Sequence, residues 1–182
     1  MNYDSNFNKE FSSGASKAFN RVFMDYSDKV YQFCYFRVGN ASCAEDLVED
    51  IFAKVLENQT NFDDSKASIK TWIFNIARNT VIDYLRSNKV VSELTETHSD
   101  DTCIASDANT QLNTELLYQA LNKLSDSDRE LIEMKYIQDL SYDEISELLN
   151  KSNGALRVSL NRALNKLKQV FSNMGIDSSN IF

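Results

Sequence analysis

Proline and glycine are nearly absent from this sequence, and their scarcity restricts the folds open to it. The chain has 182 residues, with no proline and four glycines. Both residue types interrupt helices and build tight turns, so a chain that lacks them is better suited to helices than to hairpins. Apolar residues make up 42% of the chain, which is enough for a packed core. We therefore expect an all-α protein.

Apolar residues recur at steps of three and four in two blocks, as in helices with one buried face. The first block predicts a bundle of three or four helices, one of which runs from an N-cap at Ser68 to Lys89. The expected buried stripes are Phe19, Val22, Phe23, Tyr26, Val30, Phe33 and Cys34; Leu47, Val48, Ile51, Phe52, Val55 and Leu56; and Trp72, Ile73, Ile76, Ala77, Thr80 and Leu85. In the second block, Ser127 and Ser141 each precede a glutamate by three residues, which predicts capping boxes, and Ser152 is the expected N-cap of the last helix.

Residues 90–111 separate the two blocks and carry five acids with no lysine or arginine. Their periodicity is poor and small polar residues dominate, so we expect a flexible acidic linker. An alternative is that the segment threads through a basic channel of a partner. The predicted organisation is a helical domain over 1–89, a linker over 90–111 and a second helical domain over 112–182.

Positive charge is concentrated near the C-terminus, although the formal net charge of the chain is −8. Residues 151–170 contain five cations and no acid, and they follow a short predicted helix and a tight turn. A short helix followed by a basic helix is the layout of a helix-turn-helix, whose second helix enters the DNA major groove. The candidate DNA-binding residues here are Lys151, Asn153, Arg157, Asn161, Arg162 and Lys166. A solvated basic helix on a small bundle is the alternative.

The helix predicted over residues 68–89 carries a second polar stripe, beside which lie Trp72, Phe74 and Tyr84 and, in the preceding loop, Phe62. Cations interleaved with aromatic rings suit single-stranded nucleic acid, because rings stack on bases and cations neutralise phosphates. Packing in the core is the more ordinary role for Trp72. The stripe consists of Lys70, Asn75, Arg78, Asn79 and Arg86.

Four acids, Glu45, Asp46, Glu49 and Asp50, lie on the face of a helix opposite the stripe of Leu47. Two pairs of them are four residues apart, where like charges repel by a few tenths of a kcal/mol. Such a face either serves a basic partner or is simply solvated. No nucleophile, metal motif or glycine-rich phosphate loop accompanies the acids, so we expect a protein that is not an enzyme and uses no cofactor.

The three cysteines, Cys34, Cys43 and Cys103, form no CxxC pair and are expected to be reduced thiols. His98 and Cys103 are too few for a zinc site. The N-terminal sequence lacks the basic start and apolar run of a signal peptide, and no stretch approaches about 18 apolar residues, so we expect a cytoplasmic protein without membrane insertion.

Three motifs in order give a family resemblance: AEDLVEDIFAKVLEN, then KTWIFNIARN followed by an aspartate and an arginine, then LSYDEI leading into the basic helix. Residues 15–89 and 112–170 resemble the bacterial RNA polymerase sigma factors of the extracytoplasmic-function (ECF) group. The resemblance implies a factor that binds core RNA polymerase, directs it to promoters and helps to melt the DNA.

The resemblance also implies roles for particular residues. Asp46, Glu49, Asp50 and Phe52 would dock on the β′ coiled coil, with the β flap as a second polymerase contact and an anti-sigma factor as a further partner. The stripe around Trp72 would act on the minus-ten element, with Phe62 and Asn79 as walls of a pocket for an extruded base and Arg78 and Arg86 facing the backbone. The final helix would read the minus-thirty-five element.

The sequence departs from the family pattern at several positions. Ser125 stands where a proline is usual, Asn153 near a usual acid, and Val158-Ser159 where a Ser-Arg pair is common. The lost arginine leaves the strength and sequence of minus-thirty-five recognition undecided. Two other functions remain open: a helix-turn-helix regulator that acts without polymerase, and a sigma-like adaptor that binds only proteins.

Overall fold

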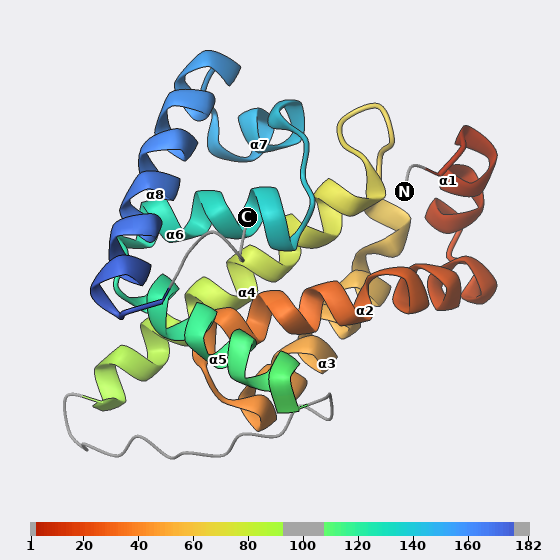
Figure 1. Ribbon diagram of the computed structural model, residues 1–182. Helices are drawn as coiled ribbons and strands as arrows, with labels where there is room; N and C mark the ends of the chain where they lie inside the picture. The colour runs from red at the N-terminus through yellow and green to blue at the C-terminus, as the bar shows by residue number, and fades with distance from the viewer. Residues whose placement is uncertain (1–2, 93–107, 177–182) are drawn as a thin grey trace. The chain divides into compact units, whose positions relative to one another are not determined.

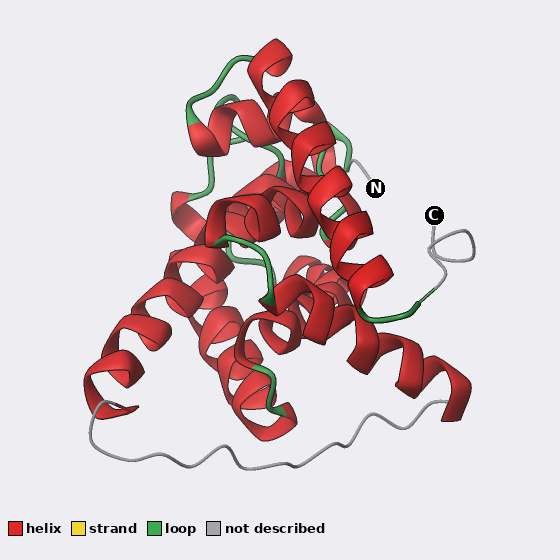
Figure 2. Cartoon of the chain, turned by 60° about the vertical axis from the view of Figure 1, so that its left-hand side comes forward, coloured by secondary structure: helices red, strands yellow, loops and turns green. Residues whose placement is uncertain are grey.

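Helices account for all the regular structure in the described residues, 3–92 and 108–176, of the computed structural model (Figures 1 and 2). The prediction of an all-α protein is therefore confirmed. The chain forms two compact units, Met1–Thr102 and Cys103–Phe182. Most of the predicted linker, together with His98 and Cys103, lies outside the described residues. Helix is found at both ends of the predicted 90–111 segment, up to Ser92 and again from Ala108.

Local sequence signals start and stop the helices of the first unit. Asp4 accepts a hydrogen bond from the backbone of Phe7, and Asn40 accepts one from Cys43, so each caps the helix that follows it. Gly39 ends the second helix at φ 68°, a left-handed conformation that glycine adopts without a steric penalty. The elements are α1 (Ser5–Ser12), α2 (Ser16–Val38), α3 (Ala41–Asn58), the short η1 (Gln59–Asn61) and α4 (Ile69–Ser92).

The core of the first unit lies where α2, α3 and α4 pack together. Most of the predicted stripes on α2 and α3 are buried, but Phe23 and Leu56 are exposed. On α4 the prediction needs correction, because Phe74 and Val81 are buried whereas Leu85 is exposed. The reason is that α4 contacts both α2 and α3. Its buried face is therefore wider than the predicted stripe, and the middle of that face does not coincide with the stripe.

In the second unit, one predicted helix cap falls on the wrong serine. Ser125, and not Ser127, is the N-cap, and its hydroxyl accepts from the backbone of Asp128. The capping box of Ser141 with Glu144 and the N-cap at Ser152 are confirmed. The elements are α5 (Ala108–Asn122), α6 (Asp126–Ile132), the π-helical η2 (Glu133–Ile137), α7 (Tyr142–Leu149) and α8 (Asn153–Asn173).

Helix α7, a tight turn and α8 form the predicted helix-turn-helix. Asn150 makes the turn at φ 52° and ψ 47°, the left-handed region that asparagine tolerates better than most residues. The Ser146 hydroxyl donates to the carbonyl of Lys151 at 2.6 Å and fixes the turn further. The inner face of α8 is buried along its whole length, through Leu156, Leu160, Ala163, Leu167 and Phe171.

A buried ion pair joins successive helices of this unit. The Arg129 Nε donates to Glu133 Oε1 at 2.8 Å, and the Glu133 side chain is fully buried. The same guanidinium donates to the side-chain carbonyl of Asn122 at the end of α5 and lies 5.8 Å from the centre of the Tyr118 ring. Removing one partner of such a pair costs more than removing both, because the remaining charge is left in a medium of low polarity.

We predict that Arg129→Met lowers the free energy of unfolding of the C-terminal unit by about 3–5 kcal/mol. Trp72 is the single tryptophan and lies in the first unit, so its fluorescence in urea should keep its midpoint while the far-UV circular dichroism loses part of its transition early. The double variant Arg129→Met/Glu133→Leu should recover most of the loss. A loss below about 1 kcal/mol, the value of an exposed pair, would contradict the prediction.

Candidate nucleic-acid interface

A hollow of about 340 Å³ lies between α3 and α4 and is bounded by η1; we call it the α3–α4 hollow. Its lining combines one indole ring, several side-chain amides, one ammonium and one carboxylate. Such a mixture suits a planar ligand that carries hydrogen-bonding edges, and the volume accommodates a group the size of a nucleobase. The lining residues are Lys54, Asn58, Asn61, Trp72, Ile76, Asn79, Thr80 and Asp83.

Hydrogen bonds hold the polar wall on the α3 side. Lys54 Nζ donates to Thr80 Oγ1 at 3.0 Å, which ties α3 to α4 beside the hollow. Asn58 Nδ2 donates to the Lys54 carbonyl at 2.9 Å, and Asn61 Nδ2 reaches Asn58 Oδ1 at 3.4 Å. Lys54, Asn58 and Asn61 were not among the site residues predicted from the sequence. The four-residue spacing of Lys54 and Asn58 places them on one helix face and could have been read from the sequence. The contact of Lys54 with Thr80 of α4 could not, because it depends on how the two helices pack.

An aromatic cluster of Phe11, Phe62 and Trp72 supports the hollow from behind. Phe62 meets Trp72 with 5.5 Å between ring centroids, and Phe11 meets the two rings edge-on at 5.6 and 6.0 Å. Phe62 is only 6% exposed and does not line the hollow, whereas Trp72 is half-buried and does. Trp72 therefore packs in the aromatic cluster, as the alternative interpretation expected, and its ring also forms part of the wall of the hollow.

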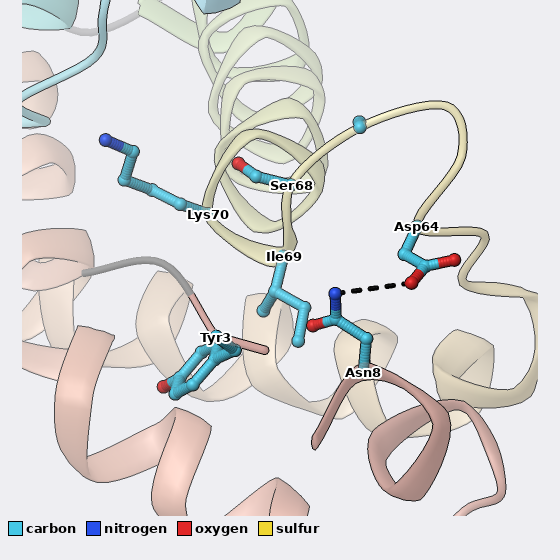
Figure 3. Close-up of a pocket in the computed structure, with 7 residues that line it drawn as sticks. Tyr3, Asn8, Asp64, Ser68, Ile69 and Lys70 are labelled. Carbon is cyan, nitrogen blue, oxygen red and sulfur yellow. Dashed lines mark hydrogen bonds between the residues drawn. The ribbon is translucent and has the colours of Figure 1, made fainter. Parts of the chain in front are cut away.

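The other predicted residues of α4 divide between its faces. Asn75, Asn79 and Arg86 are exposed, while Arg78 is half-buried. Lys70 is buried and lines a separate pocket of about 230 Å³, near Tyr3, Asn8 and Asp64, so it takes no part in the α3–α4 hollow (Figure 3).

Two of the aromatic residues predicted beside the stripe serve helix packing. Phe74 is buried and meets Phe33 of α2 edge-on. Tyr84 contacts α3, where a hydrogen bond with Cys43 and burial raise the pKa of its phenol to about 12.

The acidic residues of α3 are exposed as predicted at Glu45, Asp46, Glu49 and Asp50. Phe52 differs from them, because it is 3% exposed and packs against Phe19 and Phe23 of α2. This face thus presents carboxylates to solvent, and Phe52, predicted to share in docking, belongs to the packing of α3 on α2 instead.

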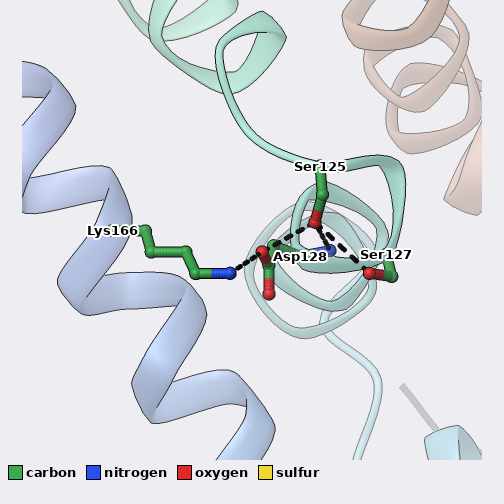
Figure 4. A network of polar contacts seen from close by, with 4 residues as sticks. All are labelled: Ser125, Ser127, Asp128 and Lys166. Carbon is green, nitrogen blue, oxygen red and sulfur yellow. Dashed lines mark hydrogen bonds and ion pairs between the residues drawn. The ribbon is translucent and has the colours of Figure 1, made fainter.

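Of the six residues predicted at the turn before α8 and on α8 itself, three are held by their own unit. The Arg157 guanidinium lies 5.0 Å from the centre of the Tyr142 ring, and Asn153 Nδ2 donates to Asp143 Oδ1 at 2.6 Å. Lys166 Nζ pairs with Asp128 Oδ2 at 2.5 Å (Figure 4). The Lys166 ammonium and the Ser125 hydroxyl lower the pKa of the Asp128 carboxyl. The other three, Lys151, Asn161 and Arg162, are exposed.

Comparison with known proteins identifies the family. Sigma-70 region 2 matches residues 22–90, and sigma-70 region 4 matches residues 114–167. The ECF RNA polymerase sigma factor SigW of Bacillus subtilis is 31% identical over 174 residues, which cover 88% of this chain and 92% of SigW. The chain belongs to the ECF RNA polymerase sigma factors. The region 2 match lies within the first unit and the region 4 match within the second, which we call the region 4 domain.

Further relatives agree with this assignment. The ECF sigma factor BldN of Streptomyces coelicolor is 29% identical over 168 residues, and this chain covers 62% of BldN's length. The fold is shared with the sigma factor RpoE of Bartonella quintana, solved in complex with the anti-sigma factor NepR. That likeness has a TM-score of 0.72 at 24% identity and covers 86% of this chain and 98% of RpoE.

The region 2 match contains every lining residue of the α3–α4 hollow, but it does not contain α1. Phe11 of α1 nevertheless completes the aromatic cluster and is fully buried. The sigma factor therefore relies on a segment outside the matched region to support the wall that holds Trp72.

We predict that two substitutions in this region differ strongly in their effect on stability. Phe62→Ala should lower the free energy of unfolding by about 3–5 kcal/mol, because it opens a cavity between Phe11 and Trp72. Asn79→Ala should change it by less than about 0.5 kcal/mol, because Asn79 is exposed. Trp72 fluorescence during urea unfolding of the full chain measures both. Equal losses would show that Asn79 serves packing and would remove it from the interface.

Proposed function

We propose that this sigma factor binds core RNA polymerase through the acidic face of α3, captures an extruded promoter base in the α3–α4 hollow, and reads the upstream promoter element with α8. The observation that supports this most directly is the hollow itself, where an indole ring and several amides meet beside exposed cationic and amide residues of α4. On this proposal the protein works by binding, in the cytoplasm, and carries out no reaction of its own.

The energetics of strand separation are consistent with such a hollow. Each stacking step of duplex DNA contributes about 1.4 kcal/mol, so opening several steps costs several kcal/mol. Stacking a captured base on an aromatic side chain returns about 1–3 kcal/mol. Trp72 offers the ring, while Asn79, Asn61 and Lys54 offer groups for the base edge and a neighbouring phosphate. Polymerase contacts supply the remainder.

Charge distribution gives the acidic face its proposed partner. Repulsion among Asp46, Glu49 and Asp50 is relieved when a cationic surface covers them, which fits the β′ coiled coil of polymerase. The β flap is the proposed contact for the region 4 domain. Since RpoE of Bartonella quintana was solved with an anti-sigma factor, an anti-sigma factor is also a proposed partner here. A net charge of −8 disfavours DNA binding by the free protein, so promoter recognition follows assembly with polymerase.

Asn79→Ala is expected to reduce open-complex formation by about tenfold, the loss of one well-placed hydrogen-bonding contact to a captured base. Permanganate reactivity of unpaired thymines on a promoter measures strand opening, and gel mobility of the complex with core polymerase measures assembly. Assembly should remain unchanged. Asn20→Ala, an exposed asparagine of α2, is the matched control. Unchanged permanganate reactivity for Asn79→Ala would remove the hollow from the melting step.

Asp46→Lys is expected to weaken binding to core polymerase at least tenfold, because a carboxylate that faces a cationic partner becomes a like charge. Asp28→Lys, at an exposed position of α2, makes the same change in net charge elsewhere and should have little effect. The dissociation constant in moderate salt measures both. If the two variants behave alike, the α3 face is not the docking surface. If the wild-type chain forms no complex at micromolar concentration, a regulator independent of polymerase becomes the better proposal.

A further inference from the structure

An exposed aliphatic side chain, Val158, lies on the outward face of α8, directly opposite the buried face of this helix. Val158 is 52% exposed, whereas Leu156 and Leu160 on either side of it in sequence are buried. At about 100° per residue, Val158 lies opposite the mean direction of the buried residues of this helix. Asn161 and Arg162, both exposed, follow it by three and four residues and therefore share its face.

A single exposed valine is ordinary on a protein surface, so exposure alone decides nothing. The position of Val158 in the helix-turn-helix is what makes its exposure informative. Val158 is in the second turn of the second helix of the helix-turn-helix, the part of such a helix that meets base edges in the major groove. Valine is also a weaker helix former than most residues, and here its side chain adds nothing to the core. Local stability therefore does not account for it.

The chemistry of the groove limits what a valine can recognise there. Base edges in the major groove offer hydrogen-bond donors and acceptors, together with one apolar group, the 5-methyl of thymine. Asn161 and Arg162 can bond to donors and acceptors, but Val158 cannot. Placed between base edges, its two methyl groups bury apolar area only against thymine, and they leave the amino group of cytosine without a partner.

We propose that Val158 contacts the 5-methyl group of a thymine in the upstream promoter element and selects thymine at that position. The inference rests on the proposed function, in which α8 reads this element. It assigns the apolar part of the recognition to Val158. A serine, which is common at this position in the family, would form hydrogen bonds and select a different base.

The test removes the methyl group from the DNA and the valine from the protein independently. The full chain, assembled with core polymerase, first selects duplexes from a pool whose upstream element is randomised. Each thymine of the selected element is then replaced in turn by deoxyuridine, which lacks only the methyl group. Binding is measured for the wild type, Val158→Ala and Val158→Ile. Gln169→Ala, exposed three turns further along the same face, is the control.

At one position, the wild type should bind thymine roughly two- to fourfold more tightly than deoxyuridine, the effect of burying one methyl group. Val158→Ala should lose that difference, while Val158→Ile and Gln169→Ala should keep it. The proposal is overturned if the wild type never distinguishes thymine from deoxyuridine, or if Val158→Ala retains the difference. If a defined element is selected but one of these two outcomes is found, only the role of Val158 is rejected and the proposed function is retained. Recovery of no element would reject the reading role of α8, and the inference with it.

Discussion

The mutual packing of the Phe11, Phe62 and Trp72 rings is the contact on which the candidate interface depends. It joins α1, the loop after η1 and the first turn of α4, which are distant in sequence. Because Trp72 is fixed from behind by two rings, its remaining surface faces the α3–α4 hollow in one orientation. A ring that is already ordered loses little conformational entropy when a base stacks on it, so on the proposed function the cluster orders the site before DNA binds.

Helix α4 has two roles: one of its faces packs in the core and another lines the α3–α4 hollow. Helix α4 buries Ile73, Ala77 and Val81 against its neighbours, yet it leaves Asn79 exposed beside the hollow. The bond from Lys54 to Thr80 lies at the boundary between the two faces. It satisfies a buried hydroxyl and links α3 to α4 beside the hollow.

Sequence reasoning succeeded where the deciding interactions were local. The caps at Ser141 and Ser152 depend on atoms within a few residues, and their spacing was enough to predict them. Ser127 was chosen wrongly because it precedes a glutamate by three residues, whereas the actual N-cap, Ser125, precedes an aspartate, Asp128, and accepts from the backbone of that residue. The burial of Phe62 requires Phe11, whose position depends on how α1 folds back. The polar lining from α3 similarly depends on the packing of two helices, which periodicity alone does not specify.

The region 4 domain uses part of its positive charge internally, and this bears on how it can bind DNA. Lys166 is paired with Asp128, and Arg157 lies over Tyr142, so fewer cations of α8 are available for phosphates than the sequence suggests. Each phosphate contact contributes about 0.9 to the dependence of log affinity on log salt, so a domain with few contacts binds weakly and with little salt dependence. On the proposed function, recognition then comes mainly from base edges, through Asn161, Arg162 and Val158, while polymerase supplies the proximity that charge alone does not.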